Sequence, residues 1–209
     1  YVLGILVAIL SGLLLKNTAF KGKPIPFVME LPAYRFPSAR SVLLHMWEKA
    51  KDFLRKAFTI IFIASLVIWF LQSLDWKLNL VEDSANSILA SIGSAIAPIF
   101  TPLGFGDWRA STALITGLTA KESVVSTLAI LTGASSDAQL GGILQTMFTP
   151  LSAFSFLAFT ILYMPCVAAF AASRRELGSW KAAAGTALYQ TGAAYVVSLL
   201  IFQVGRLFL

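Results

Sequence analysis

The sequence predicts an all-α membrane protein, a polytopic helical bundle with an interfacial amphipathic helix and a broken or re-entrant helix. Apolar residues make up 57% of the 209 residues, and the mean hydropathy is +0.79. Only 12% of the residues are charged, whereas soluble domains contain about 25%. The apolar residues gather in long stretches separated by short polar links. A charge inside such a stretch is costly and usually marks a pathway or a counter-ion.

Composition also excludes several classes of protein. A single cysteine, Cys166, rules out an internal disulfide framework and a zinc site built from several cysteines. No phosphate-binding loop, HExxH motif or dinucleotide-binding glycine pattern occurs, so we expect neither a nucleotide site nor an enzyme in this chain. The net charge of +6 would suggest nucleic acid in a soluble protein. Here it favours contact with anionic lipid instead, because the basic residues cluster in one connecting segment.

The N-terminal quarter contains an apolar run, a polar link and an amphipathic segment. Residues 1–15 are apolar but short for a span of about 20 residues, so we expect the span to begin upstream, in a longer polypeptide. Residues 16–40 carry four prolines and predict an extended loop. In residues 41–56 apolar side chains recur at helical spacing opposite a charged face, which indicates a helix in the membrane interface. Residues 16–56 hold nine Lys or Arg against three Asp or Glu, so we place them on the cytoplasmic side.

The next segments predict a span followed by a half-helix. Residues 57–74 form the second span, and an acidic link follows at residues 75–83. Residues 84–100 are rich in Ser, Ala and Gly and are too short for a lipid-facing span. We expect them to form a half-helix or re-entrant element, with Pro98 and Pro102 as its structural break.

Residues 108–131 predict one long helix with a polar face. Five hydroxyl side chains recur along it at steps of three and four, which would place them on one side: Thr112, Thr116, Thr119, Ser123 and Ser126. Glu122 lies beside this row, and Lys121 is rotated from it by about 100°. One interpretation is that the row lines a hydrated pathway and that Glu122 provides negative charge for a cation. The alternative is that the hydroxyls bond back to their own helix and Glu122 pairs with a nearby base.

A second candidate site lies in the fourth span, residues 151–172. Pro165 cannot donate an amide hydrogen bond, so the helix should break there and the carbonyl of Ile161 should lose its partner. A free carbonyl next to the Met164 thioether and the Cys166 thiol gives mixed oxygen and sulfur ligands, which suit a transition metal. The alternative is that Cys166 is a small buried apolar residue. A basic link and a final span at residues 182–209 complete the chain.

Three segments together carry a resemblance to a known family. Residues 31–57 read LPAYRFPSARSVLLHMWEKAKDFLRKA and precede an apolar span. Residues 104–131 read GFGDWRASTALITGLTAKESVVSTLAIL, and residues 163–176 read YMPCVAAFAASRRE. The first string resembles the C-terminal membrane region of the bacterial ferrous iron transporters of the FeoB family. The other two resemble the second Gate region of the same family.

The resemblance implies transport of Fe²⁺ across the bacterial inner membrane by a multi-pass protein. It implies that residues 1–209 form a membrane transport domain, with a Gate-like region at 84–172. The remaining membrane helices and a GTP-binding domain would lie elsewhere in the parent protein. The iron-handling cysteine of the family lies in a Pro-Cys motif, here Pro165 and Cys166. Fe²⁺ would be the transported ion with no tightly bound cofactor, the partners would be the lipid bilayer and those missing parts, and a homo-oligomer remains open.

Two other functions stay open at this stage. Gate regions also occur in nucleoside permeases, and a permease for an organic solute would need amides or carboxylates near the middle of the membrane. Gln190 and Gln203 are the amides in the last span that could serve in this way. The second alternative is a membrane subunit that anchors or regulates a partner and transports nothing.

Overall fold

The computed structural model describes residues 2–18, 36, 38–56, 59, 62–81 and 84–208. The chain divides into two compact units, Tyr1–Arg55 and Lys56–Leu209, each of which is described by itself. The extended loop expected at residues 16–40 lies largely outside the described residues. Its first three residues belong to the preceding helix.

The first unit contains two helices of different character. Helix α1, Val2–Thr18, is apolar on all sides. Helix α2, Ala39–Lys56, is amphipathic and follows Ser38, whose hydroxyl accepts a hydrogen bond from the Ser41 amide at 3.3 Å. Its apolar face includes the exposed side chains of Leu43 and Trp47. The predicted amphipathic helix is therefore confirmed as a helix, and its location at a membrane surface stays a prediction.

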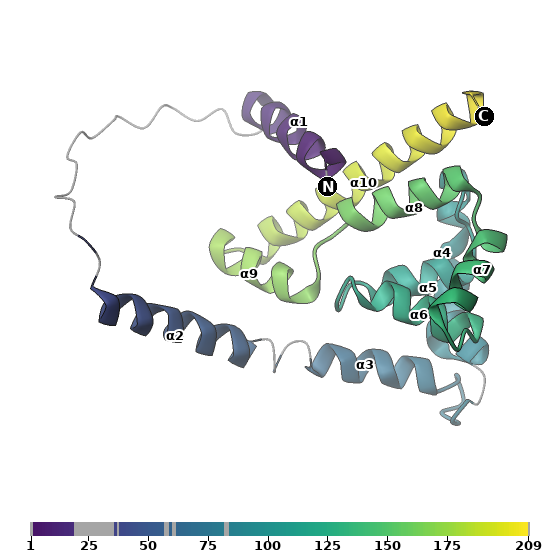
Figure 1. Ribbon diagram of the computed structural model, residues 1–209, viewed down its shortest axis with the longest axis horizontal. Coiled ribbons are helices and arrows are strands. Elements are labelled where there is room, and N and C mark those ends of the chain that lie inside the picture. Colours follow the sequence, from purple (N-terminus) through teal and green to yellow (C-terminus); the bar gives the residue numbers. More distant parts are fainter. Residues whose placement is uncertain are drawn as a thin grey trace. The chain divides into compact units, whose positions relative to one another are not determined.

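The second unit consists of helices over its described residues (Figure 1). In chain order these are α3 (Phe62–Ser73), η2 (Ser84–Asn86), α4 (Ile88–Phe100), η3 (Thr101–Leu103), α5 (Trp108–Thr116), α6 (Ser123–Thr132), α7 (Asp137–Met147), α8 (Pro150–Leu162), α9 (Val167–Leu177) and α10 (Trp180–Phe208). Helix α8 packs along α10, and α4 packs against α5.

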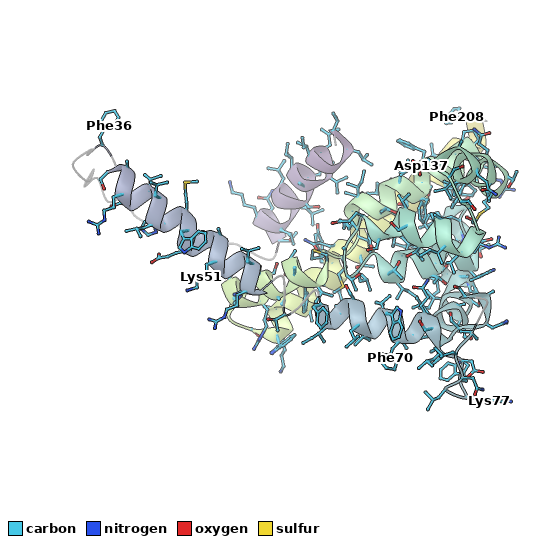
Figure 2. All side chains as sticks on the ribbon, turned by 60° about the horizontal axis from the view of Figure 1, so that its bottom comes forward. Phe36, Lys51, Phe70, Lys77, Asp137 and Phe208 are labelled. Carbon is cyan, nitrogen blue, oxygen red and sulfur yellow. The ribbon has the colours of Figure 1, made fainter. Side chains whose placement is uncertain are left out.

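A loop follows α3, and Lys77 marks its tip (Figure 2). The Asp75 carboxylate accepts hydrogen bonds from the backbone amides of Lys77 and Asn79 at 2.7 and 2.9 Å. The hydrogen bond from the Asn79 amide lowers the pKa of Asp75 below its ordinary value of 3.8. The Asp75 carboxylate thus stabilises the turn of this loop.

Length and apolar composition fit membrane spans in three places among the described residues. Helix α10 has 29 residues and is long enough to cross a bilayer alone. Two further candidates are bent pairs: α4 with η3 turns into α5 by 106°, and α7 turns into α8 by 108°. Each pair is either a broken span or a re-entrant loop. The prediction of an all-α membrane fold with a broken or re-entrant helix is confirmed.

Aromatic rings fill the core of the second unit. Phe105 packs on Phe100 and Phe156, with ring centroids 5.4 and 5.3 Å apart, and Phe159 stacks on Tyr163 at 5.4 Å. Small residues of α10, among them Ala194 and Ser198, are fully buried, which lets α8 and α10 approach closely. The core therefore fixes α8 and its C-terminal end at Tyr163.

The prediction of one continuous helix over residues 108–131 is wrong. Helix α5 ends at Thr116 and α6 begins at Ser123, with turns over residues 117–122 between them. The helical hydrogen bonding is replaced by short-range bonds, for example from the Leu118 amide to the Ile115 carbonyl at 3.1 Å and from Thr119 to Thr116 at 3.0 Å. The five hydroxyls therefore do not lie along one helix.

Candidate functional site

Two interruptions of helical structure meet in the second unit. The first break, residues 117–122, separates α5 from α6, and the second break, residues 163–166, separates α8 from α9. The Val167 amide donates a hydrogen bond to the Leu118 carbonyl at 2.8 Å. The Tyr163 hydroxyl donates to the Leu114 carbonyl at 3.2 Å. Backbone groups left without helical partners in one break are thus satisfied by the other.

Gly117 allows this close contact. A Cβ atom at this position would overlap the Tyr163 hydroxyl and a methyl group of Val124. Tyr163 is 5% exposed and Val124 is 3% exposed, so both side chains lie inside the protein. A glycine is therefore required where the backbone of the first break contacts Tyr163 of the second break.

Lys121 joins the two breaks through its charge. Its ammonium group donates hydrogen bonds to the carbonyls of Ile161 at 3.0 Å and Tyr163 at 3.4 Å. The same nitrogen lies 4.8 Å from the centre of the Tyr163 ring, a cation–π contact. Within the described residues no carboxylate lies at ion-pair distance from this lysine. Two main-chain oxygens and one aromatic face therefore compensate the charge.

The effect of Pro165 follows its chemistry. Helix α8 ends at Leu162 and the chain is extended through Cys166, as a proline without an N–H predicts. The Ile161 carbonyl, which loses its helical donor, is the one that accepts from Lys121 at 3.0 Å. The carbonyl expected to be free for a metal thus has a cation bound to it already.

The two sulfur candidates lie in or beside this break. Met164 and Cys166 are half-buried, and Cys166 is the residue before the first turn of α9. The Cys166 thiol is close enough to interact electrostatically with both Lys121 and the Tyr163 hydroxyl. In the part of the chain that the structure describes, no three His, Cys, Asp or Glu side chains gather into a metal-binding group. A metal held here by this chain would need sulfur and main-chain oxygen together.

Glu122 lies at the end of the first break, directly before α6, and is exposed. Ser123 is half-buried and Ser126 is exposed. Of the described basic groups, none lies within ion-pair distance of the Glu122 carboxylate. The expected pairing of Glu122 with a nearby base is therefore absent from the described residues.

The other hydroxyls of the predicted row are buried and bonded locally. Thr112 donates to the Trp108 carbonyl at 2.8 Å, Thr116 to Ala113 at 2.8 Å and Thr119 to Thr116 at 2.7 Å. Thr116 also shares a 2.8 Å hydrogen bond with Thr127 of α6. These three contacts match the alternative interpretation of the row. A role in lining a pathway stays a prediction for all five residues.

The bend between α4 and α5 is held in a different way. Pro98 lies inside α4, which continues to Phe100, and Pro102 lies in η3, so the turn itself falls at residues 104–107. Gln203 of α10 donates its side-chain amide to the Pro102 carbonyl at 2.8 Å. Tyr195 of α10 donates its hydroxyl to the Ile99 carbonyl at 3.0 Å. Neutral donors from α10 satisfy the carbonyls of this bend.

A cavity of about 530 Å³ lies beside the first break. Its lining is mostly apolar and comes from α6, α7 and α8, with Lys121, Gln145 and Thr160 as the polar members. A smaller cavity of about 410 Å³, which includes Asp107 and Thr101, lies at the bend. The Lys121 side chain therefore has open volume next to it.

Sequence reasoning missed the residues that join the two breaks. The sequence places Lys121 only by its rotation away from the hydroxyl row, and Tyr163 only as part of its motif. The available signal was Gly117, the glycine between Thr116 and the Thr-Ala-Lys-Glu run. A glycine inside an apolar helical pattern weakens the prediction of a continuous helix.

Two family models match the chain in succession. The model for the C terminus of the ferrous iron transport protein B matches residues 1–49. The Gate model, described as nucleoside recognition, matches residues 54–180, a range that includes both breaks and the bend. No solved structure matches the chain.

Curated relatives cover the whole chain. The Fe(2+) transporter FeoB of Staphylococcus aureus is 43% identical over 208 residues, which are 100% of this chain and 31% of that protein. The Fe(2+) transporter FeoB of Methanocaldococcus jannaschii is 39% identical over 99% of this chain and 32% of its own length. A fusion of Fe(2+) transport protein A with FeoB from Porphyromonas gingivalis is 38% identical over 100% of this chain and 30% of its own length. The chain spans about a third of the length of these relatives.

Proposed function

This chain belongs to the Gate family, in the form found in the C-terminal membrane region of FeoB proteins, and we propose that it conducts ferrous iron across a membrane. The relatives that cover it are named Fe(2+) transporters. In this proposal residues 1–209 form one transport domain, with residues 16–56 on the cytoplasmic side and a Gate-like region at 84–172. The membrane is the bacterial inner membrane.

The second break is the observation that carries the proposal. Met164 and Cys166, a thioether and a thiol, lie in the same break as Pro165, which removes the helical donor of the Ile161 carbonyl. Broken helices near the middle of a membrane are where transporters hold their ions. Sulfur and carbonyl oxygen together suit Fe²⁺ better than Na⁺ or K⁺. Cys166 and Met164 are the proposed ligands, and the exposed Glu122 is the proposed point of entry.

Weak binding is part of the mechanism. An ion that passes must leave each site, so each should hold Fe²⁺ with few protein ligands. Fe²⁺ is low in the Irving–Williams order, and ligand type alone would not exclude Zn²⁺ or Cu²⁺. Selectivity must therefore come from geometry or from the supply of metal.

The remaining two thirds of FeoB proteins complete the proposed transporter. We expect them to include the GTP-binding domain and the other membrane helices. Each bent pair would then be covered by helices from outside this chain, because broken backbone at membrane depth must be shielded from lipid. Assembly into a homo-oligomer would be compatible with this arrangement.

Uptake of ⁵⁵Fe²⁺ tests the proposal, with this chain in its full-length protein and with membrane abundance controlled. Cys166→Ser should lower uptake by at least about 10-fold, since losing even an outer-shell partner costs a metal site that much. Glu122→Gln should lower it as well, and Glu176→Gln, an exposed acid at the end of α9, is the matched control. Uptake that is unchanged in both Cys166→Ser and Glu122→Gln would favour a membrane subunit without a transport role.

The description of the Gate model favours one other candidate, a permease for nucleosides or related solutes. Such a site needs free amides, and the Gln190 side-chain oxygen is buried without a hydrogen-bond partner among the described residues. Gln203 is already engaged with Pro102. Uptake of labelled uridine that depends on Gln190, with no uptake of Fe²⁺, would establish this function in place of iron transport.

A further inference from the structure

The carbonyls of Ile161 and Tyr163, termed the carbonyl site below, already hold a positive charge. The Lys121 ammonium lies 3.0 and 3.4 Å from the two oxygens and 4.8 Å from the centre of the Tyr163 ring. All three groups present negative potential to one point. Their arrangement favours a cation at that point, whichever cation it is.

The same carbonyls could have been satisfied without a charge. At the bend between α4 and α5, a glutamine amide and a tyrosine hydroxyl satisfy the Pro102 and Ile99 carbonyls at 2.8 and 3.0 Å. A lysine inside an apolar stretch has a large desolvation cost that these neutral donors avoid. Within the described residues no carboxylate offsets that cost for Lys121. Closing the break therefore does not by itself account for the ammonium group.

The structure also provides space for the ammonium to move. Lys121 lines the cavity of about 530 Å³ between α6, α7 and α8, together with the polar side chains of Gln145 and Thr160. The ammonium group of a lysine sits on a flexible four-carbon chain, so it can readily change its position. It therefore has room to turn away from the carbonyls into a cavity that also contains polar side chains.

We propose that the carbonyl site is a binding site for a divalent cation, and that the Lys121 ammonium occupies it until the cation displaces it. The inference rests on the proposed function, because it makes the resting lysine a tethered competitor of the transported ion. The divalent cation and the Lys121 ammonium would repel each other at contact distance, so they cannot occupy the carbonyl site together. Lys121 thereby keeps the site weak for metal, which favours release over trapping.

Binding of Mn²⁺ under anaerobic conditions tests the proposal, followed by electron paramagnetic resonance on the full-length protein in lipid nanodiscs. If the ammonium occupies the site about nine-tenths of the time, Lys121→Met should bind Mn²⁺ about 10-fold more tightly than wild type. Lys121→Arg keeps the charge and should bind no more tightly than wild type. Gln203→Met removes a neutral donor of similar size and should leave the affinity unchanged. Affinity that is equal or lower in Lys121→Met would overturn the proposal.

A second measurement needs no variant and covers the case in which Lys121→Met fails to fold. Mn²⁺ should increase the rate at which an amine-reactive reagent acylates Lys121 in the wild-type protein, read by peptide mass spectrometry. A rate that Mn²⁺ leaves unchanged would contradict displacement.

Uptake of ⁵⁵Fe²⁺ by the wild type separates this inference from the proposed function. Fe²⁺ uptake by the wild type, with no change of Mn²⁺ affinity in Lys121→Met, would refute the role of Lys121 as a competitor and would still support iron transport. An affinity change without Fe²⁺ uptake would support a cation site and refute iron as the transported ion.

Discussion

The chain interrupts its helices in two ways, and the groups that close each interruption differ. At the bend between α4 and α5, α10 supplies neutral donors, Gln203 and Tyr195, to carbonyls in η3 and at the end of α4. Where the two breaks meet, Lys121 supplies a charged donor to the carbonyls at the end of α8. Both solutions satisfy backbone oxygens that would otherwise be costly inside a membrane. The charged solution also creates a site that another cation can occupy.

The difference assigns separate roles to the two regions. At the bend, neutral donors satisfy the Ile99 and Pro102 carbonyls, so the residues that supply them should affect stability and leave cation affinity unchanged. The paired breaks combine a mobile charge, sulfur atoms and a cavity, so their residues should affect cation affinity. The variants below test this separation, from the largest expected loss of stability to the smallest.

Gly104→Ala should cause the largest loss of stability. Gly104 has φ +87°, and a Cβ atom there would overlap the ring of Phe202. The left-handed backbone costs about 1–2 kcal/mol and the overlap about 1–3 kcal/mol. Gly133→Ala is the control, because Gly133 has φ +67° with open space around it and should lose only the backbone part. Thermal unfolding in detergent measures both, and equal losses would show that the contact with Phe202 is unimportant.

Gly117→Ala should lower the free energy of unfolding by less, and it should act on the paired breaks. Its backbone is ordinary, but a Cβ atom would overlap the Tyr163 hydroxyl and Val124. We expect a loss of about 1–3 kcal/mol from the overlap, partly offset by about 0.4–1 kcal/mol from the stiffer unfolded chain. Because the breaks are pushed apart, Lys121 should also react faster with amine reagents. Acylation at the wild-type rate would mean that the contact between the breaks does not hold the lysine.

Gln203→Met should lose about 0.6–1.7 kcal/mol, the range for side-chain hydrogen bonds inside membrane proteins. Its bond to the Pro102 carbonyl is 2.8 Å long. The same thermal unfolding measurement applies. A change in Mn²⁺ affinity in this variant would contradict the separation of roles, because no cation is expected at the Pro102 carbonyl.

Much of this arrangement could be predicted from the sequence. Pro165 has no N–H, which is a local property, so the end of α8 and the loss of a donor to Ile161 were predictable. The gap between α5 and α6 had only Gly117 as a signal, because hydroxyls continue at helical spacing from Thr112 to Ser126 and no proline interrupts them. That gap depends on tertiary contacts, such as the one from Val167 to Leu118. The Ile161 carbonyl that binds Lys121 is 40 residues away in sequence, so no periodic pattern of residues could predict this contact.

The loop after α3 should show the smallest effect. The pKa of Asp75 is lowered by the Asn79 amide, so its carboxylate stabilises the loop above pH 3.8 and loses that effect as the pH falls through the lower folded pKa. After correction for intrinsic rates, the amides of Lys77 and Asn79 should lose protection from hydrogen exchange only in that acidic range. Asp75→Asn should remove this dependence on pH. Loss of protection between pH 5 and pH 8 would contradict it.

Iron K-edge X-ray absorption of the Fe²⁺-loaded full-length protein tests most directly whether iron is held at the second break. The spectrum of the wild type should contain sulfur and oxygen neighbours of iron, and the sulfur contribution should fall in Cys166→Ser while Gly133→Ala retains it. A spectrum with only oxygen and nitrogen neighbours, identical in wild type and Cys166→Ser, would show that iron is not held at this break.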